Sequence, residues 1–136
     1  MAYYIGIFLA LAAFLFARFT GLDRDRAFYP TVMIVIALIY GLFAVLGGDV
    51  TALLGWESVG IVGFILMAVL GFKFNLWLVV AALAGHGVFD LFHGHVIANA
   101  GVPVWWPSFC MTYDLTAAAG LAWLLGKSKI EAKVAG

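Results

Sequence analysis

Charged residues are scarce in this sequence, which has 136 residues. Lys, Arg, Asp and Glu make up 10% of the chain, whereas a soluble domain carries about 25%. Hydrophobic residues make up 66%, which is more apolar surface than a chain of this length hides in a core of its own. The composition therefore predicts an integral membrane protein, with the lipid bilayer as its main partner.

The sequence also has no net charge and only one cysteine. The formal net charge is zero at pH 7, so there is no basic field to attract nucleic acid. The single cysteine, Cys110, excludes an internal disulfide. No Lys or Arg precedes Arg18, so the first apolar stretch lacks the basic region of a secretory signal and is expected to be retained as a helix.

Five apolar stretches are long enough to cross a bilayer, for which a helix needs about 20 mainly apolar residues. Pro30 suits the first turn of the second stretch, and Asn75 and Ser108 suit the caps of the fourth and fifth. The sequence therefore predicts a single all-α domain, an integral bundle of five transmembrane helices. The predicted spans are residues 3–19, 29–46, 50–70, 76–98 and 108–126.

Basic residues predict which ends of these spans face the cytoplasm. With five crossings, the first loop, the third loop and the C-terminal tail lie on one side of the membrane. All seven basic residues fall in these regions or, for Arg18, at the adjoining end of the first span. We therefore expect the N-terminus outside and the C-terminus in the cytoplasm, in the cytoplasmic (inner) membrane. The residues are Arg18, Arg24, Arg26, Lys73, Lys127, Lys129 and Lys133.

Ionisable side chains inside the spans mark the candidate site, because such residues are costly at membrane depth and usually functional. The acids are Glu57, Asp90 and Asp114. His86, Asp90 and His93 are spaced i, i+4, i+7, so they share one helix face. The rise of 1.5 Å per residue places all five groups in the outer half of the bilayer. We expect them to line a polar pocket between the third, fourth and fifth spans, open toward the outer face.

Carboxylates at this depth must be protonated, paired with protonated histidines or bound to a metal. Imidazole and carboxylate donors favour zinc or iron. The leading hypothesis is a metal site with His86, Asp90, His93 and Asp114 as ligands and Glu57 as a ligand or general base. Glu57 and Asp114 are the candidate catalytic residues. A metal ion there would suit a hydrolase or oxidoreductase that acts on a lipid-like substrate.

Three other interpretations stay open. The same residues suit metal-free acid–base or proton-relay chemistry. They also suit a structural network in a homo-oligomer or in a small accessory subunit of a larger membrane complex, where one histidine would hold a pigment or haem. A transporter would need several copies to enclose a path.

Other polar residues are placed outside the candidate site. His95 points away from the shared face and is expected at the membrane interface. Cys110 is interpreted as a packing residue, and residues 23–26 are interpreted as a solvated turn.

The last third of the chain carries a recognisable set of motifs. His-x3-Asp-x2-His is followed by Gly-Val-Pro, by Trp-Pro-Ser-Phe-Cys and by Tyr-Asp, all between Gly85 and Trp123. In these features the chain resembles a group of small multi-pass bacterial membrane proteins to which no activity is assigned. The resemblance therefore implies a membrane protein and no particular reaction.

Overall fold

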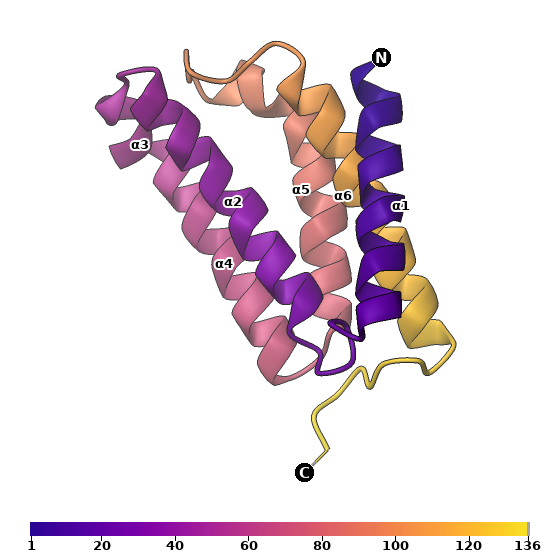
Figure 1. Ribbon diagram of the computed structural model, residues 1–136. Coiled ribbons are helices and arrows are strands. Elements are labelled where there is room, and N and C mark those ends of the chain that lie inside the picture. Colours follow the sequence, from indigo (N-terminus) through magenta and orange to yellow (C-terminus); the bar gives the residue numbers. More distant parts are fainter. Residues whose placement is uncertain (136) are drawn as a thin grey trace.

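A computed structural model describes residues 1–135, and within them all the regular elements are helices (Figure 1). Five of the helices are long and apolar enough to cross a membrane, which confirms an all-α bundle with five candidate spans. Those five are α1 (Ala2–Thr20), α2 (Phe28–Leu46), α4 (Trp56–Lys73), α5 (Trp77–Val96) and α6 (Trp106–Gly126), and the short α3 is Val50–Leu54.

The third predicted span differs from the structure at its start. We predicted one helix from residue 50, but the chain breaks at Gly55, which has φ −97° and ψ −132°. The carboxylate of Asp49 caps α3 by accepting a hydrogen bond of 2.9 Å from the backbone N–H of Ala52. The crossing helix then begins at Trp56 and runs to Lys73. As a result, Glu57 lies in the first turn of α4, close to one end of the candidate span.

The helices pack in two groups that meet at α5. Helices α1 and α5 both pack against α6, and α2 packs against α4 (Figure 1). The contact between α4 and α5 joins the two groups. Met33, Leu83 and Leu121 are fully buried between them, whereas Phe8, Leu42 and Val62 are exposed on outer helix faces. Exposed apolar side chains on every long helix suit a bundle surrounded by lipid.

Polar contacts tie the loops together at the end of the bundle that holds the α1–α2 turn. Arg18 donates a hydrogen bond of 2.8 Å to Asp23, whose side chain is buried. Arg26 donates to the carbonyl oxygen of Phe72, at 2.9 Å, and to that of Glu131 in the tail. The interpretation of residues 23–26 as a solvated turn was therefore wrong for Asp23, whose side chain is buried, whereas the half-buried Arg26 links the turn to α4 and the tail.

Helix α1 approaches α6 closely at Gly6. A side-chain carbon at Gly6 would overlap the Thr112 hydroxyl and the carbonyl oxygen of Phe109. The same hydroxyl lies 3.0 Å from the carbonyl oxygen of Tyr3, to which it can donate a hydrogen bond across the interface. Small residues that let backbones approach, with hydrogen bonds across the contact, are typical of helix pairs in membranes.

Gly6→Val is therefore expected to push α1 away from α6 and to lower the free energy of unfolding by about 1–3 kcal/mol, as overpacking does. Gly63→Val is the matched control, because nothing lies within 4 Å of the position its side chain would take on α4. Denaturant titration in detergent micelles, followed by tryptophan fluorescence, measures both variants. Equal stabilities of the two variants would contradict the close packing of α1 on α6.

Candidate functional site

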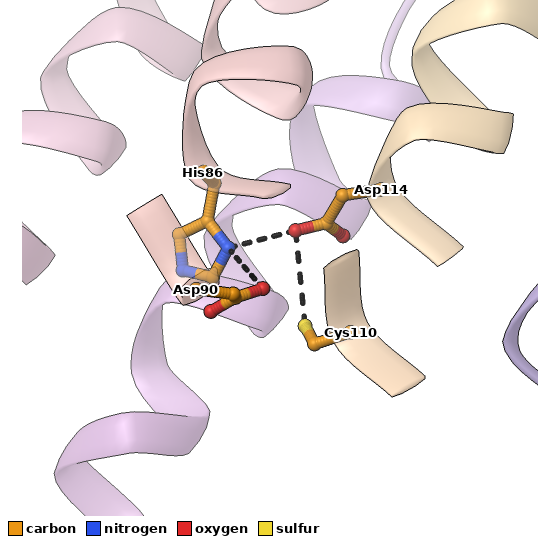
Figure 2. Close-up of side chains that lie close together, drawn as sticks. All are labelled: His86, Asp90, Cys110 and Asp114. Atoms are coloured by element: carbon orange, nitrogen blue, oxygen red, sulfur yellow. Dashed lines mark hydrogen bonds and ion pairs between the residues drawn. The ribbon is translucent and has the colours of Figure 1, made fainter. Parts of the chain in front are cut away.

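Four ionisable side chains meet between α5 and α6 (Figure 2). His86 and Asp90 come from α5, and Cys110 and Asp114 come from α6, each pair one helical turn apart. One potential ligand atom of each residue lies within 4.8 Å of the others, and all four residues are buried. Gly87 keeps the helices close, because a side-chain carbon there would lie 3.1 Å from the carbonyl oxygen of Met111.

The imidazole of His86 is at the centre of this four-residue group. Its Nδ1 lies 2.7 Å from Asp114 Oδ2, a short hydrogen bond, and 3.6 Å from Asp90 Oδ2, which is too long for one. The Cys110 thiol donates a longer hydrogen bond, of 3.7 Å, to the same Asp114 oxygen. Two carboxylates therefore approach one imidazole nitrogen, and the thiol joins the group through the Asp114 oxygen that His86 also contacts.

The four-residue group has spare capacity for a cation. Asp90 Oδ2 and Asp114 Oδ1 are buried and have no hydrogen-bond partner within residues 1–135. In the same part of the chain, the only salt-bridge partner of these two aspartates is His86. An unsatisfied buried carboxylate oxygen is costly. Nitrogen, sulfur and oxygen donors together match the ligand types of zinc and iron, so the group can hold a metal ion.

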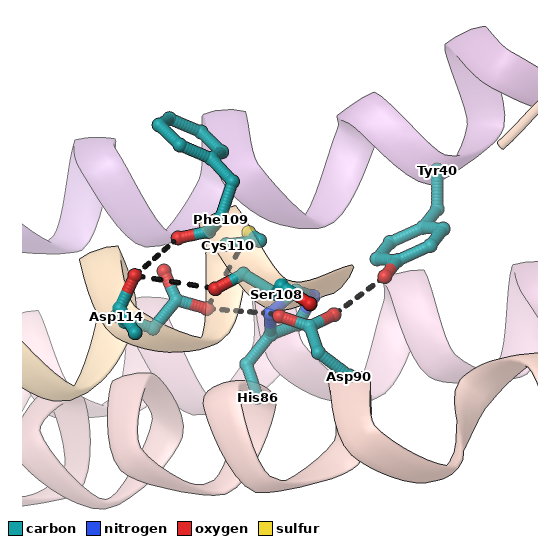
Figure 3. A network of polar contacts seen from close by, with 8 residues as sticks. Tyr40, His86, Asp90, Ser108, Phe109, Cys110 and Asp114 are labelled. Carbon is teal, nitrogen blue, oxygen red and sulfur yellow. Dashed lines mark hydrogen bonds and ion pairs between the residues drawn. The ribbon is translucent and has the colours of Figure 1, made fainter. Parts of the chain in front are cut away.

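Tyr40 adds a contact from α2 that the sequence analysis missed (Figure 3). Its hydroxyl donates a hydrogen bond of 2.5 Å to Asp90 Oδ1, and its ring lies against His93 with centroids 4.1 Å apart. The hydroxyl therefore occupies one oxygen of Asp90 and leaves Oδ2 on the His86 side. A buried tyrosine usually finds a partner for its hydroxyl. The position of Tyr40 inside an apolar span was therefore the one feature of the sequence that could have indicated this contact.

Glu57 and His93 form a second buried pair. His93 Nε2 lies 2.9 Å from Glu57 Oε1. The side chain of Asn99, in the loop after α5, donates to the same Glu57 oxygen at 2.6 Å and to the carbonyl oxygen of Tyr40 at 3.1 Å. Tyr40 thus touches both the Glu57–His93 pair and the four-residue group.

The structure brings together three of the predicted ligands, His86, Asp90 and Asp114. It adds Cys110, which we had interpreted as a packing residue, because its thiol faces Asp114. The ligand roles of His93 and Glu57 stay predictions, since the two side chains bond to each other outside the four-residue group. His95 is exposed near the end of α5.

The expected open polar pocket is closed in the structure. Glu57, His86 and Tyr40 line only a small cavity of about 10 Å³, which is about the space that one water molecule fills. The polar side chains are instead packed against one another, and each of the five predicted site residues is at most 2% exposed. Any reacting group must therefore reach them through a separate opening or after a movement of the helices.

No known protein family matches the chain, and no curated protein or solved structure matches it either. The site residues are buried inside helices that are long and apolar enough to cross a membrane, and they offer nitrogen, oxygen and sulfur ligand atoms.

Tyr40→Phe is expected to lower the free energy of unfolding by about 1–3 kcal/mol, because it leaves a buried Asp90 oxygen unpaired. Tyr29→Phe is the control on the same helix. The Tyr29 side chain is equally buried, but its hydroxyl has no hydrogen-bond partner in the described part of the chain, so its removal should be neutral or stabilising. Denaturant titration of both variants measures the difference, and a larger loss for Tyr29→Phe would argue against the Tyr40–Asp90 contact.

Proposed function

We propose that this membrane protein binds one zinc or iron ion at His86, Asp90, Cys110 and Asp114, and converts a lipid-like substrate by hydrolysis or by a redox reaction. The observation that carries the metal site is the convergence of the four-residue group, with ligand atoms within 4.8 Å of one another in a buried place. Two carboxylates there need compensation, and a divalent cation supplies more of it than one imidazole.

The residues of the chain divide into ligands and supporting groups. The bound ion would supply a Lewis-acid or redox centre in a place that excludes bulk water. Tyr40 holds Asp90 by its hydrogen bond, as partners of metal-binding carboxylates commonly do. Glu57, the candidate general base, is held by His93 and Asn99, and its carboxylate would accept a proton released at the site.

One observation favours a second candidate function without metal. The hydrogen bond of 2.7 Å between His86 Nδ1 and Asp114 already pairs one carboxylate. In that case His86 and Asp114 form an acid–base pair, or the polar groups serve to hold α4, α5 and α6 together in a homo-oligomer or a larger membrane complex. Metal content separates these candidates from the first.

Purified protein is expected to contain about one zinc or iron ion per chain by elemental analysis. His86→Ala removes the central nitrogen donor and should lower the affinity for the metal at least about tenfold, because loss of even a residue that supports a ligand typically costs about 10–100-fold, so less metal should remain after purification. His95→Ala is the matched control on the same helix, because His95 is exposed and outside the four-residue group. It should keep the full metal content.

Glu57→Gln should also keep the metal, since Glu57 is paired with His93. Wild-type protein without stoichiometric metal, even after incubation with zinc and ferrous iron, would exclude the proposed metal site and leave the metal-free candidates. Loss of metal from Glu57→Gln would instead make Glu57 a ligand. Circular dichroism and gel filtration of each variant show whether the helices and the fold are retained.

We also propose that the N-terminus lies outside and the C-terminus in the cytoplasm. The supporting observation is that the α1–α2 loop, the α4–α5 loop and the C-terminal tail lie at one end of the bundle (Figure 1), and that the basic residues lie in these segments or in the adjoining last turns of α1 and α4. A membrane-impermeant maleimide applied to intact cells should label Ala100→Cys, at the opposite end, and not Ser128→Cys. Labelling of Ser128→Cys and not of Ala100→Cys would contradict this orientation and indicate the opposite one.

A further inference from the structure

An apolar groove lies between α2 and α6, beside the four-residue group. Helix α2 packs mainly against α4, and α6 mainly against α5 and α1, so the facing sides of α2 and α6 leave space between them. The groove has a volume of about 620 Å³, within the range of about 300–1,000 Å³ that is typical of small-molecule sites. Its walls include Phe28, Val32, Ile36 and Ile39 of α2 and Phe109 of α6.

Cys110 connects the groove to the proposed metal site. It lines the groove and is also the α6 residue whose thiol lies 3.7 Å from Asp114 Oδ2. Trp106, one helical turn earlier, lines the groove too, and its buried indole N–H has no hydrogen-bond partner within residues 1–135. The groove also reaches the α1–α2 loop, where Asp25 lines it. A mainly apolar groove with a few polar groups is the usual form of a ligand site.

The groove opens at a depth where the surroundings are hydrocarbon. Val35 lines it and is 52% exposed, so this stretch of α2 is an edge of the opening. Val35 lies seven residues after the first residue of α2, which is about 10 Å along the helix at 1.5 Å per residue. The hydrocarbon core of a bilayer is about 30 Å thick. In a bilayer this side would face acyl chains of neighbouring lipids, and a water-soluble ligand would have no direct access to it.

We propose that the groove binds one acyl chain of a membrane lipid and brings it to Cys110 and the four-residue group. This inference rests on the proposed function and specifies its substrate class as an acyl lipid, because the opening at Val35 admits hydrocarbon and the walls are apolar. The chain enters sideways from the bilayer between α2 and α6, and the bundle does not have to open at either end.

The test uses the full-length protein in vesicles of phosphatidylethanolamine and phosphatidylglycerol. A trace of phosphatidylcholine with a photoactivatable diazirine in one acyl chain is added, and the vesicles are illuminated. Peptide mass spectrometry then locates the adducts. We expect adducts on the α2 and α6 segments that line the groove, residues 28–39 and 106–113, in excess over adducts on the exposed face of α4 around Val62.

Val35→Trp places a bulky ring in the opening, and Val62→Trp is the matched control. Both valines are exposed to a similar extent, 52% and 54%, but only Val35 lines the groove. Val35→Trp should lower adduct formation in the groove about tenfold, a change that corresponds to about 1.4 kcal/mol. Val62→Trp should leave it unchanged. Because both substitutions are on exposed faces, both variants should remain folded, which gel filtration checks.

Equal labelling of groove and α4 segments in the wild type would overturn the proposal, as would unchanged groove labelling in Val35→Trp. Crosslinks from the groove to a second copy of the chain would assign it to an oligomer interface instead and would also overturn it. Metal content is measured on the same samples. Groove labelling without metal rejects the metal site and keeps the acyl-chain site, whereas metal without groove labelling rejects only the acyl-chain site.

Discussion

The short contact between His86 and Asp114 is the interaction on which the centre of this structure depends. A carboxylate among membrane-spanning helices is costly unless a proton, a cationic partner or a metal ion compensates it. Asp114 is fully buried, and its compensation within the described residues comes from His86 at 2.7 Å. Because these residues belong to α5 and α6, the same contact that compensates the charge also fixes how the two helices pack.

The remaining polar groups extend this contact across the bundle. Tyr40 brings α2 to Asp90, and its ring lies against His93, which pairs with Glu57 of α4. Four of the five candidate spans thereby contribute polar side chains to connected contacts, and α1 is attached through its close packing on α6. Asp90 Oδ2 and Asp114 Oδ1 nevertheless have no hydrogen bond within residues 1–135, which is the physical reason to infer a cation rather than a purely structural network.

The groove between α2 and α6 lies beside a site that is otherwise closed. The Glu57, His86 and Tyr40 side chains leave space for about one water molecule, which is too little for a lipid-like molecule. Cys110 is at once a groove residue and a member of the four-residue group. A substrate that enters from the hydrocarbon layer would therefore meet the site at its thiol.

The features that could be predicted from the sequence are those determined by residues within a single helix. Hydrophobic length predicted the five candidate spans, and the i, i+4 spacing predicted that His86 and Asp90 share a face. The features that the sequence did not predict depend mainly on contacts between segments that are distant in sequence. Cys110 lies one helical turn before Asp114, so the spacing placed both on one face of α6, but a single thiol in an apolar helix is more often a packing residue and was interpreted as one. Tyr40 and Asn99 were missed because their partners are distant in sequence, and the break at Gly55 falls inside an uninterrupted apolar run.

X-ray absorption spectroscopy of the zinc-loaded protein tests the central claim most directly, because it reports the ligand atoms themselves. We expect one sulfur neighbour at about 2.3 Å and nitrogen or oxygen neighbours at about 2.0–2.2 Å, with the sulfur contribution lost in Cys110→Ser. A spectrum with only nitrogen and oxygen neighbours, unchanged by Cys110→Ser, would contradict the site formed by His86, Asp90, Cys110 and Asp114.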